Sequence, residues 1–63
     1  QFIEFEVVML LNPIKDVAAG EVGVVLMVHG DGEAYEVEFP NVETSELTYT
    51  IPSSYLARSH PTA

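Results

Sequence analysis

The sequence predicts an all-β fold in which five short strands close into one small barrel. Apolar residues recur at every second position and do not follow the period of a helix. Glycine and proline positions divide these apolar runs into short segments. A chain of 63 residues is also too short for two packed sheets of usual size. A bent meander needs only one apolar face per strand, and its closure removes most free sheet edges.

The first strand is expected from Ile3 to Leu11, because Asn12 and Pro13 then interrupt it. Its odd-numbered residues are all apolar, so we expect that face of the strand to point into the core. The outward face would then carry Glu4, Glu6, Val8 and Leu10. A loop follows and ends at Gly20.

A hairpin is expected next, with strands over residues 21–28 and 35–39. Its turn contains two glycines and an aspartate, which accept the positive φ of tight turns. Gly23 lies inside the first strand and indicates a bulge or a close approach of two backbones. On that strand Val22, Val24, Leu26 and Val28 share one face, and Val25, Met27 and His29 share the outward face. On the next strand Tyr35, Val37 and Phe39 are expected inward, and Glu36 and Glu38 outward.

The C-terminal part of the chain predicts two more strands and a short turn. Residues 47–51 alternate, with Leu47, Tyr49 and Ile51 on one face. Residues 52–55 predict a single 3₁₀ turn, and residues 56–58 a brief final strand. A 3₁₀ turn at this place fits an SH3-like barrel. The barrel is therefore expected to span residues 1–58, and residues 59–63 to form a C-terminal tail.

The charge of the chain excludes several partners. Ten acidic residues oppose Lys15 and Arg58, which gives a net charge of −8. Nucleic-acid binding normally needs a basic stripe, and anionic membranes repel an acidic surface. A basic protein partner, or solubility alone, would explain the charge. The chain has no cysteine, no membrane-length apolar run and no leader-like pattern, so we expect a cytoplasmic protein.

Catalytic and metal-binding patterns are lacking. No serine lies in a Gly-x-Ser-x-Gly elbow, and cysteine is absent. His29 and His60 have no evident partners that would complete a metal site or a catalytic pair. We therefore expect a protein that is not an enzyme and that uses no cofactor and no metal.

Two carboxylate pairs and an apolar stripe form the candidate binding surface. Each pair has i, i+2 spacing, which places both carboxylates on one strand face. The apolar residues between them are expected outward, and an apolar patch with a polar rim often marks an interface. The candidate partner-binding residues are Glu4, Glu6, Val25, Met27, Glu36 and Glu38. The alternatives are that the carboxylates form plain solvated faces and that the apolar stripe is buried under the loop at residues 12–20.

These features favour a non-catalytic protein-interaction module that docks a basic partner. In one version it is an inhibitory or antitoxin-like partner of a basic enzyme, and in another it is an accessory subunit. The alternative is a structural barrel that self-associates into a homo-oligomer through the apolar stripe.

Two segments carry a resemblance to a known family. Residues 19–25 read Ala-Gly-Glu-Val-Gly-Val-Val, and residues 35–39 read Tyr-Glu-Val-Glu-Phe. With the Leu/Thr strand at 47–51 and the Pro-x-x-x-Leu segment at 52–56, the chain resembles small bacterial domains known as domain of unknown function 4926. The resemblance covers residues 5–58 and implies an SH3-like barrel without an established activity. The glycine-spaced second strand is also similar to KOW-like barrels, which are normally basic and bind RNA, and the acidic charge of this chain departs from them.

Overall fold

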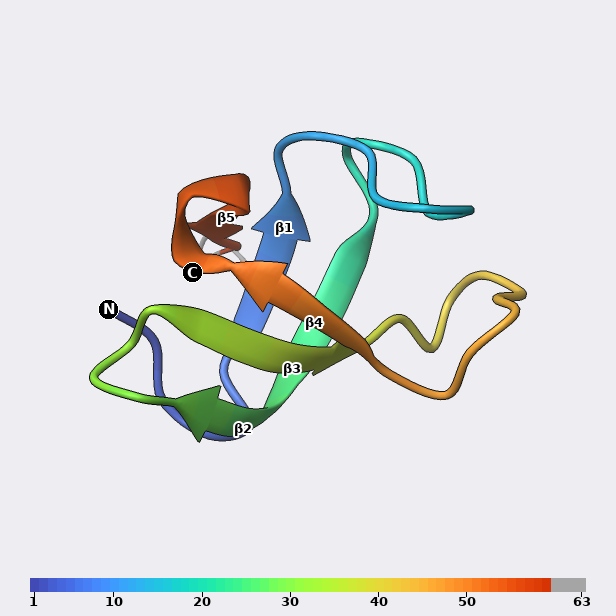
Figure 1. The fold of residues 1–63 in the computed structure, drawn as a ribbon. Helices are drawn as coiled ribbons and strands as arrows, with labels where there is room; N and C mark the ends of the chain where they lie inside the picture. The colour runs from blue at the N-terminus through green and yellow to red at the C-terminus, as the bar shows by residue number, and fades with distance from the viewer. Residues whose placement is uncertain (60–63) are drawn as a thin grey trace.

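The computed structural model describes residues 1–59, which form five β-strands and one 3₁₀ turn (Figure 1). The elements are β1 (Val7–Leu10), β2 (Val22–His29), β3 (Ala34–Glu38), β4 (Tyr49–Pro52), η1 (Ser53–Tyr55) and β5 (Leu56–Arg58). Residues 60–63 of the expected tail lie outside the described residues, so the tail stays a prediction. Among residues 1–59, no helix has the length and apolar character needed to span a bilayer.

All five strands belong to one antiparallel sheet with the order β4-β3-β2-β1-β5. Strands β1 to β4 pair in chain order, and β5 returns to pair with β1. The two edge strands, β4 and β5, are joined only by η1, so the sheet must curl back on itself. Figure 1 shows this curl, with β3 and β4 crossing in front of β1 and β2. The predicted all-β, barrel-like fold of five strands with a lone 3₁₀ turn is therefore confirmed.

The core lies inside the curled sheet and is entirely apolar apart from two tyrosine hydroxyls. The residues that are buried are Phe2, Val8, Leu10, Val17, Val25, Tyr35, Val37, Phe39, Tyr49, Ile51 and Leu56. No buried side-chain nitrogen or oxygen among the described residues lacks a hydrogen-bond partner. Such a core meets the main condition for burying polar atoms, which is that each finds a partner.

The prediction for the first strand was wrong in its start and in its inward face. Residues 3–6 form a turn, in which Phe5 has a φ of +70° and the Glu6 N–H donates to the Ile3 carbonyl at 3.1 Å. Because β1 begins after this turn, Val8 and Leu10 point inward and are fully buried. The odd-numbered residues, expected in the core, are exposed instead: Ile3, Phe5, Val7, Met9 and Leu11.

Phe2 is the N-terminal residue that packs into the core, whereas Ile3 and Phe5 are exposed. Its ring meets the Tyr35 ring edge-on, with 5.2 Å between centroids. Its backbone N–H donates to the buried Tyr35 hydroxyl at 3.0 Å. The N-terminus is therefore packed against β3 before the chain enters β1.

Strand β2 contains both features that Gly23 was expected to indicate, at two different places. A Cβ at Gly23 would lie 2.6 Å from Val37 Cγ1 and 2.7 Å from the Glu38 carbonyl oxygen, so the close approach is confirmed. The bulge lies further along, between Val25 and Met27, where the pairing with β3 shifts. Val25 itself is opposite Val37 and fully buried, so its expected outward position was wrong.

The remaining strands largely confirm the alternation pattern. Tyr35, Val37 and Phe39 are buried, as are Tyr49 and Ile51 on β4. Strand β4 begins at Tyr49, however, and Leu47 is 91% exposed in the loop before it. The expected 3₁₀ turn and final strand are present as η1 and β5.

Candidate functional site

The face of β1 and β2 that points away from the core carries a row of apolar side chains. Val7 pairs with Val24 and Met9 with Val22, so these four residues lie side by side on adjacent strands. Directly paired residues share a sheet face, and their inward neighbours Val8 and Gly23 are buried. Met27 continues the row beyond the bulge. We call Val7, Met9, Val22, Val24 and Met27 the outer apolar face.

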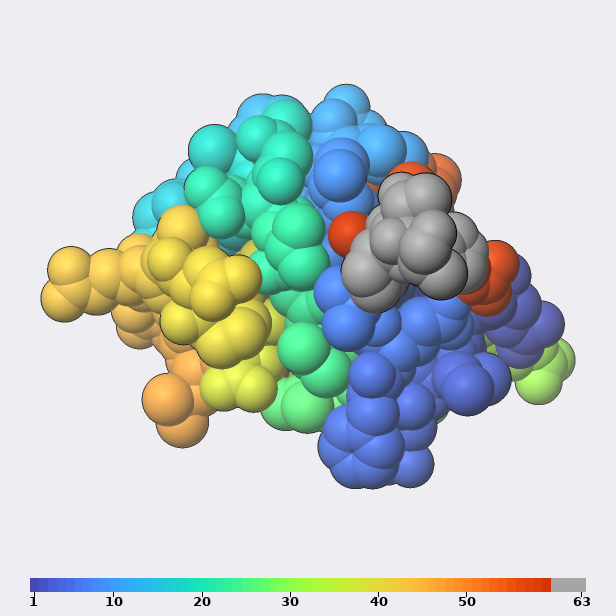
Figure 2. All heavy atoms as spheres, turned by 180° about the vertical axis from the view of Figure 1, so that it is seen from behind, coloured from blue at the N-terminus to red at the C-terminus, as the bar shows by residue number. Residues whose placement is uncertain are grey.

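The outer apolar face is accessible in the described structure. Met27 is 55% exposed, Val7 and Met9 are exposed, and the two β2 valines are half-buried. Phe5 adjoins the face, since its N–H donates to the Val25 carbonyl, and its side chain is 69% exposed. Figure 2 views the molecule from behind, where the blue N-terminal residues and the teal residues of β2 lie side by side. Exposed apolar residues in the middle strands of a sheet, and not only at its edges, call for an explanation.

Strand β3 supplies the acidic border of this face. Glu38 pairs with Val24 and is exposed, and Glu36 pairs with Met27. Because Val37 between them is buried, both carboxylates lie on the outward side of the sheet. The structure therefore brings Met27, Glu36 and Glu38 together, as the sequence predicted.

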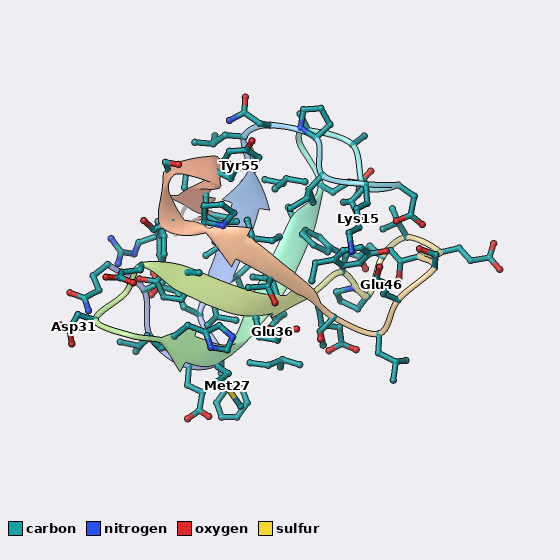
Figure 3. All side chains as sticks on the ribbon, viewed as in Figure 1. Lys15, Met27, Asp31, Glu36, Glu46 and Tyr55 are labelled. Atoms are coloured by element: carbon teal, nitrogen blue, oxygen red, sulfur yellow. The ribbon has the colours of Figure 1, made fainter. Side chains whose placement is uncertain are left out.

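Glu36, which is labelled in Figure 3, nevertheless forms several hydrogen bonds within the chain. It accepts hydrogen bonds from the hydroxyls of Thr48 at 2.6 Å and Thr50 at 2.8 Å, and His29 Nε2 lies 3.1 Å from it. These hydrogen bonds, that of Thr48 first, hold the pKa of Glu36 below its ordinary value. Glu36 therefore links β3 to the start of β4, and Glu38 is the more accessible carboxylate of the pair.

In the N-terminal pair, too, one carboxylate (Glu6) forms hydrogen bonds within the chain and the other (Glu4) is exposed. Glu6 accepts a hydrogen bond from Arg58 Nε and another from the Ile3 N–H at 3.1 Å. The hydrogen bond to Glu6 raises the pKa of Arg58, which also donates to the Gln1 carbonyl at 2.8 Å. Glu4 lies in the turn before β1 and is exposed.

Of the candidate residues, Glu4, Met27 and Glu38 are exposed, Glu6 and Glu36 serve intramolecular contacts, and Val25 is core. The sequence interpretation missed Val7, Met9, Val22 and Val24, which it assigned to the inward faces. One signal for them was present: residues 7–11 and 24–28 are uninterrupted apolar runs, so each strand has an apolar residue on both sides. Such a run fixes neither face as the inner one.

A second polar cluster ties the two long loops together away from this face. The Tyr49 hydroxyl donates to Asp16 Oδ1 at 2.5 Å, and the Ser45 N–H donates to Asp16 Oδ2 at 2.8 Å. The hydrogen bond from Tyr49, followed by that from Ser45, lowers the pKa of Asp16. Beside it, Lys15 Nζ lies 2.8 Å from Glu46 Oε2, which raises the pKa of Lys15. Through these contacts the cluster joins the loop at residues 11–21 to the loop at residues 39–48.

The two basic side chains are both paired within the chain, Lys15 with Glu46 and Arg58 with Glu6. The other eight of the ten acidic residues form no salt bridge with lysine or arginine among residues 1–59. In the same part of the chain, no group of three or more histidine or acidic side chains is placed to hold a metal ion. The described surface also has no pocket. The described surface is therefore acidic and partly apolar.

The comparison with known families agrees with the resemblance found at residues 19–25 and 35–39. The model of the domain of unknown function (DUF4926) matches residues 4–57. The chain belongs to this family. The DUF4926 match spans every strand described above, from the turn before β1 into β5. No curated protein and no solved structure matches the chain significantly.

Proposed function

We propose that this DUF4926 domain is a non-catalytic protein-interaction module, acting in the cytoplasm, that docks a basic partner on the outer apolar face. The observation that carries the proposal is the exposure of Met27, Met9 and Val7 on β1 and β2, two of the three inner strands of the sheet. Interfaces commonly combine an apolar centre with a polar rim, and Met is enriched at such centres. Here Glu38 provides part of the rim.

The charge distribution supports a basic partner. With both cations paired internally, the surface offers mainly carboxylates to an approaching protein. Complementary charge speeds association and orients the two surfaces, whereas the apolar contacts supply most of the affinity. The partner is therefore expected to present apolar side chains flanked by lysine or arginine. An inhibitor of a basic enzyme and an accessory subunit of a larger assembly both fit this description.

A second copy of the chain is the competing occupant of the face. The same apolar residues would favour it, because identical patches meet across a two-fold axis. Close packing of two such faces would bring like charges together, which opposes self-association at low salt. Light scattering at low and high salt measures this directly, and a dimer at both salt concentrations would overturn the proposal of a basic partner.

The main test uses Met27→Glu with Leu47→Glu as the matched control. Both changes replace an exposed apolar side chain by glutamate, but Leu47 lies in the loop before β4. The probe is a synthetic helical peptide with one stripe of leucines flanked by lysines, and a scrambled peptide of equal composition is its control. Binding is followed by fluorescence anisotropy.

Charge alone predicts slightly tighter peptide binding by both variants. The proposal predicts weaker binding by Met27→Glu, unchanged or tighter binding by Leu47→Glu, and a preference for the striped peptide. Equal binding by the two variants would refute docking on the outer apolar face. Capture from cell lysate with the same two variants then identifies the natural partner as the protein lost only with Met27→Glu.

A further inference from the structure

We infer that Met9 and Met27 are oxidation sites that switch off docking on the outer apolar face, an inference that rests on the proposed function. The chain has two methionines, and both belong to this face. Met9 lies on β1 opposite Val22, and Met27 lies on β2 opposite Glu36. The core contains valine, leucine, isoleucine and aromatic residues but no methionine.

The position of the two thioethers makes them accessible to an oxidant. Met9 is 36% exposed, and Met27 is more exposed. Because the chain has no cysteine, these sulfur atoms are its only thiol or thioether groups. An oxidant that spares aromatic rings would therefore act on the outer apolar face first.

The reaction is a two-electron oxidation by a peroxide. A sulfur lone pair attacks one peroxide oxygen, a new S–O bond forms and the O–O bond breaks. The departing hydroxide takes the proton that the attacked oxygen carried and leaves as water, so the peroxide is reduced and the thioether becomes a sulfoxide. The sulfoxide is polar, and dedicated reductases return it to methionine.

Oxidation should change docking without changing the fold. The fold depends on the buried residues of the barrel, none of which is oxidised in this reaction. The face, in contrast, would gain a polar S=O group on each of two adjacent strands. A group that must lose its water on docking, without a matched partner, weakens the contact. The chain would thus detach from its partner under oxidising conditions and rebind after reduction.

The experiment oxidises the full chain with hydrogen peroxide and measures three quantities. Peptide mapping by mass spectrometry locates the added oxygen, thermal denaturation measures the fold, and anisotropy with the striped leucine-lysine peptide measures docking. The oxidation-resistant control is the double variant Met9→Leu with Met27→Leu, which keeps apolar side chains of similar size. Treatment of the oxidised chain with methionine sulfoxide reductase provides the reversal.

The expected result is oxidation of both methionines in the folded chain and a melting temperature close to that of the reduced chain. The affinity for the peptide should fall by about tenfold or more. The double variant should have the same affinity for the peptide before and after peroxide treatment, because it has no thioether to oxidise. If the oxidised chain binds as well as the reduced chain while Met27→Glu does not bind, the oxidation switch is refuted and the docking face stands. If Met27→Glu also binds normally, the proposed function itself fails. A large loss of melting temperature on oxidation would place a methionine in the core and refute the inference as well.

Discussion

Val25→Glu should strongly destabilise this protein, whereas Met27→Glu should leave its stability almost unchanged. Val25 is fully buried between β1 and β3, where its N–H donates to the Glu6 carbonyl and it faces Val37 across the sheet. Met27 is two residues further along β2, beyond the bulge, and is mostly exposed. The two substitutions therefore test directly which residues of β2 face the core and which face outward.

The size of the effect follows from the burial of Val25. Removing its apolar side chain from the core forfeits about 1.5–3 kcal/mol of transfer free energy. The larger glutamate adds about 1–3 kcal/mol of overpacking. A buried carboxyl group without a partner adds about 1–3 kcal/mol even in its neutral form. Together these terms reach about 4 kcal/mol or more, whereas a domain of 63 residues is stable by about 3–9 kcal/mol in total.

Circular dichroism with thermal and urea denaturation measures both variants. Val25→Glu should be largely unfolded at neutral pH, and Met27→Glu should differ from the natural chain by about 0.5 kcal/mol or less. Burial raises the pKa of the carboxyl group in Val25→Glu, so the deficit relative to the natural chain should shrink as the pH falls from that raised pKa to the ordinary pKa of glutamate. A Val25→Glu chain that melts like the natural one would refute the inward assignment of Val25 and, with it, the definition of the outer apolar face.

Two further predictions concern the close packing of β2 and the polar cluster between the loops. Gly23→Ala places a Cβ against the Glu38 carbonyl oxygen, a backbone atom that cannot move cheaply, and should cost about 1–3 kcal/mol. Gly20→Ala, at a φ of +95° with no atom within 4 Å, reports backbone strain alone, and Gly23→Ala melting no lower than the natural chain would contradict the close approach. Asp16 has a lowered pKa in the folded chain, so its stabilising contribution is present above the unfolded pKa and is lost as the pH falls through the folded one. Asp16→Asn should therefore melt below the natural chain at neutral pH, and the gap should close in acid; a gap independent of pH would argue against this role.

Much of the C-terminal half could be predicted from the sequence because polar and apolar residues alternate there. In β3 the two glutamates mark the outward side, so the inward side of Tyr35, Val37 and Phe39 is unambiguous. The hairpin turn and the 3₁₀ turn each contain residues whose backbone preferences fix the local conformation. In such segments the local signal and the tertiary structure agree.

The N-terminal strand could not be predicted in the same way. Its inward face depends on where the preceding turn ends, and a left-handed Phe5 gives no signal in the sequence, since bulky residues rarely adopt a positive φ. The hydrogen-bond partners of the acidic residues could not be predicted from local sequence either, because they lie far away along the chain. Arg58 reaches Glu6, and Tyr49 reaches Asp16, only because the sheet curls and brings β5 and the two long loops into place.

The sequence nonetheless allowed us to predict that an apolar surface faces outward, although it did not identify most of the residues that form it. Residues 7–11 are apolar at every position, so an apolar row faces outward whichever side of β1 turns inward. Reversing the inward side exchanged Val8 and Leu10 for Val7 and Met9 but left the outward surface apolar. A barrel made of one curled sheet has only one interior, and it cannot bury both sides of its central strands. The apolar surplus of β1 and β2 must therefore lie on the outside, and this outward surplus is the observation from which we propose a partner.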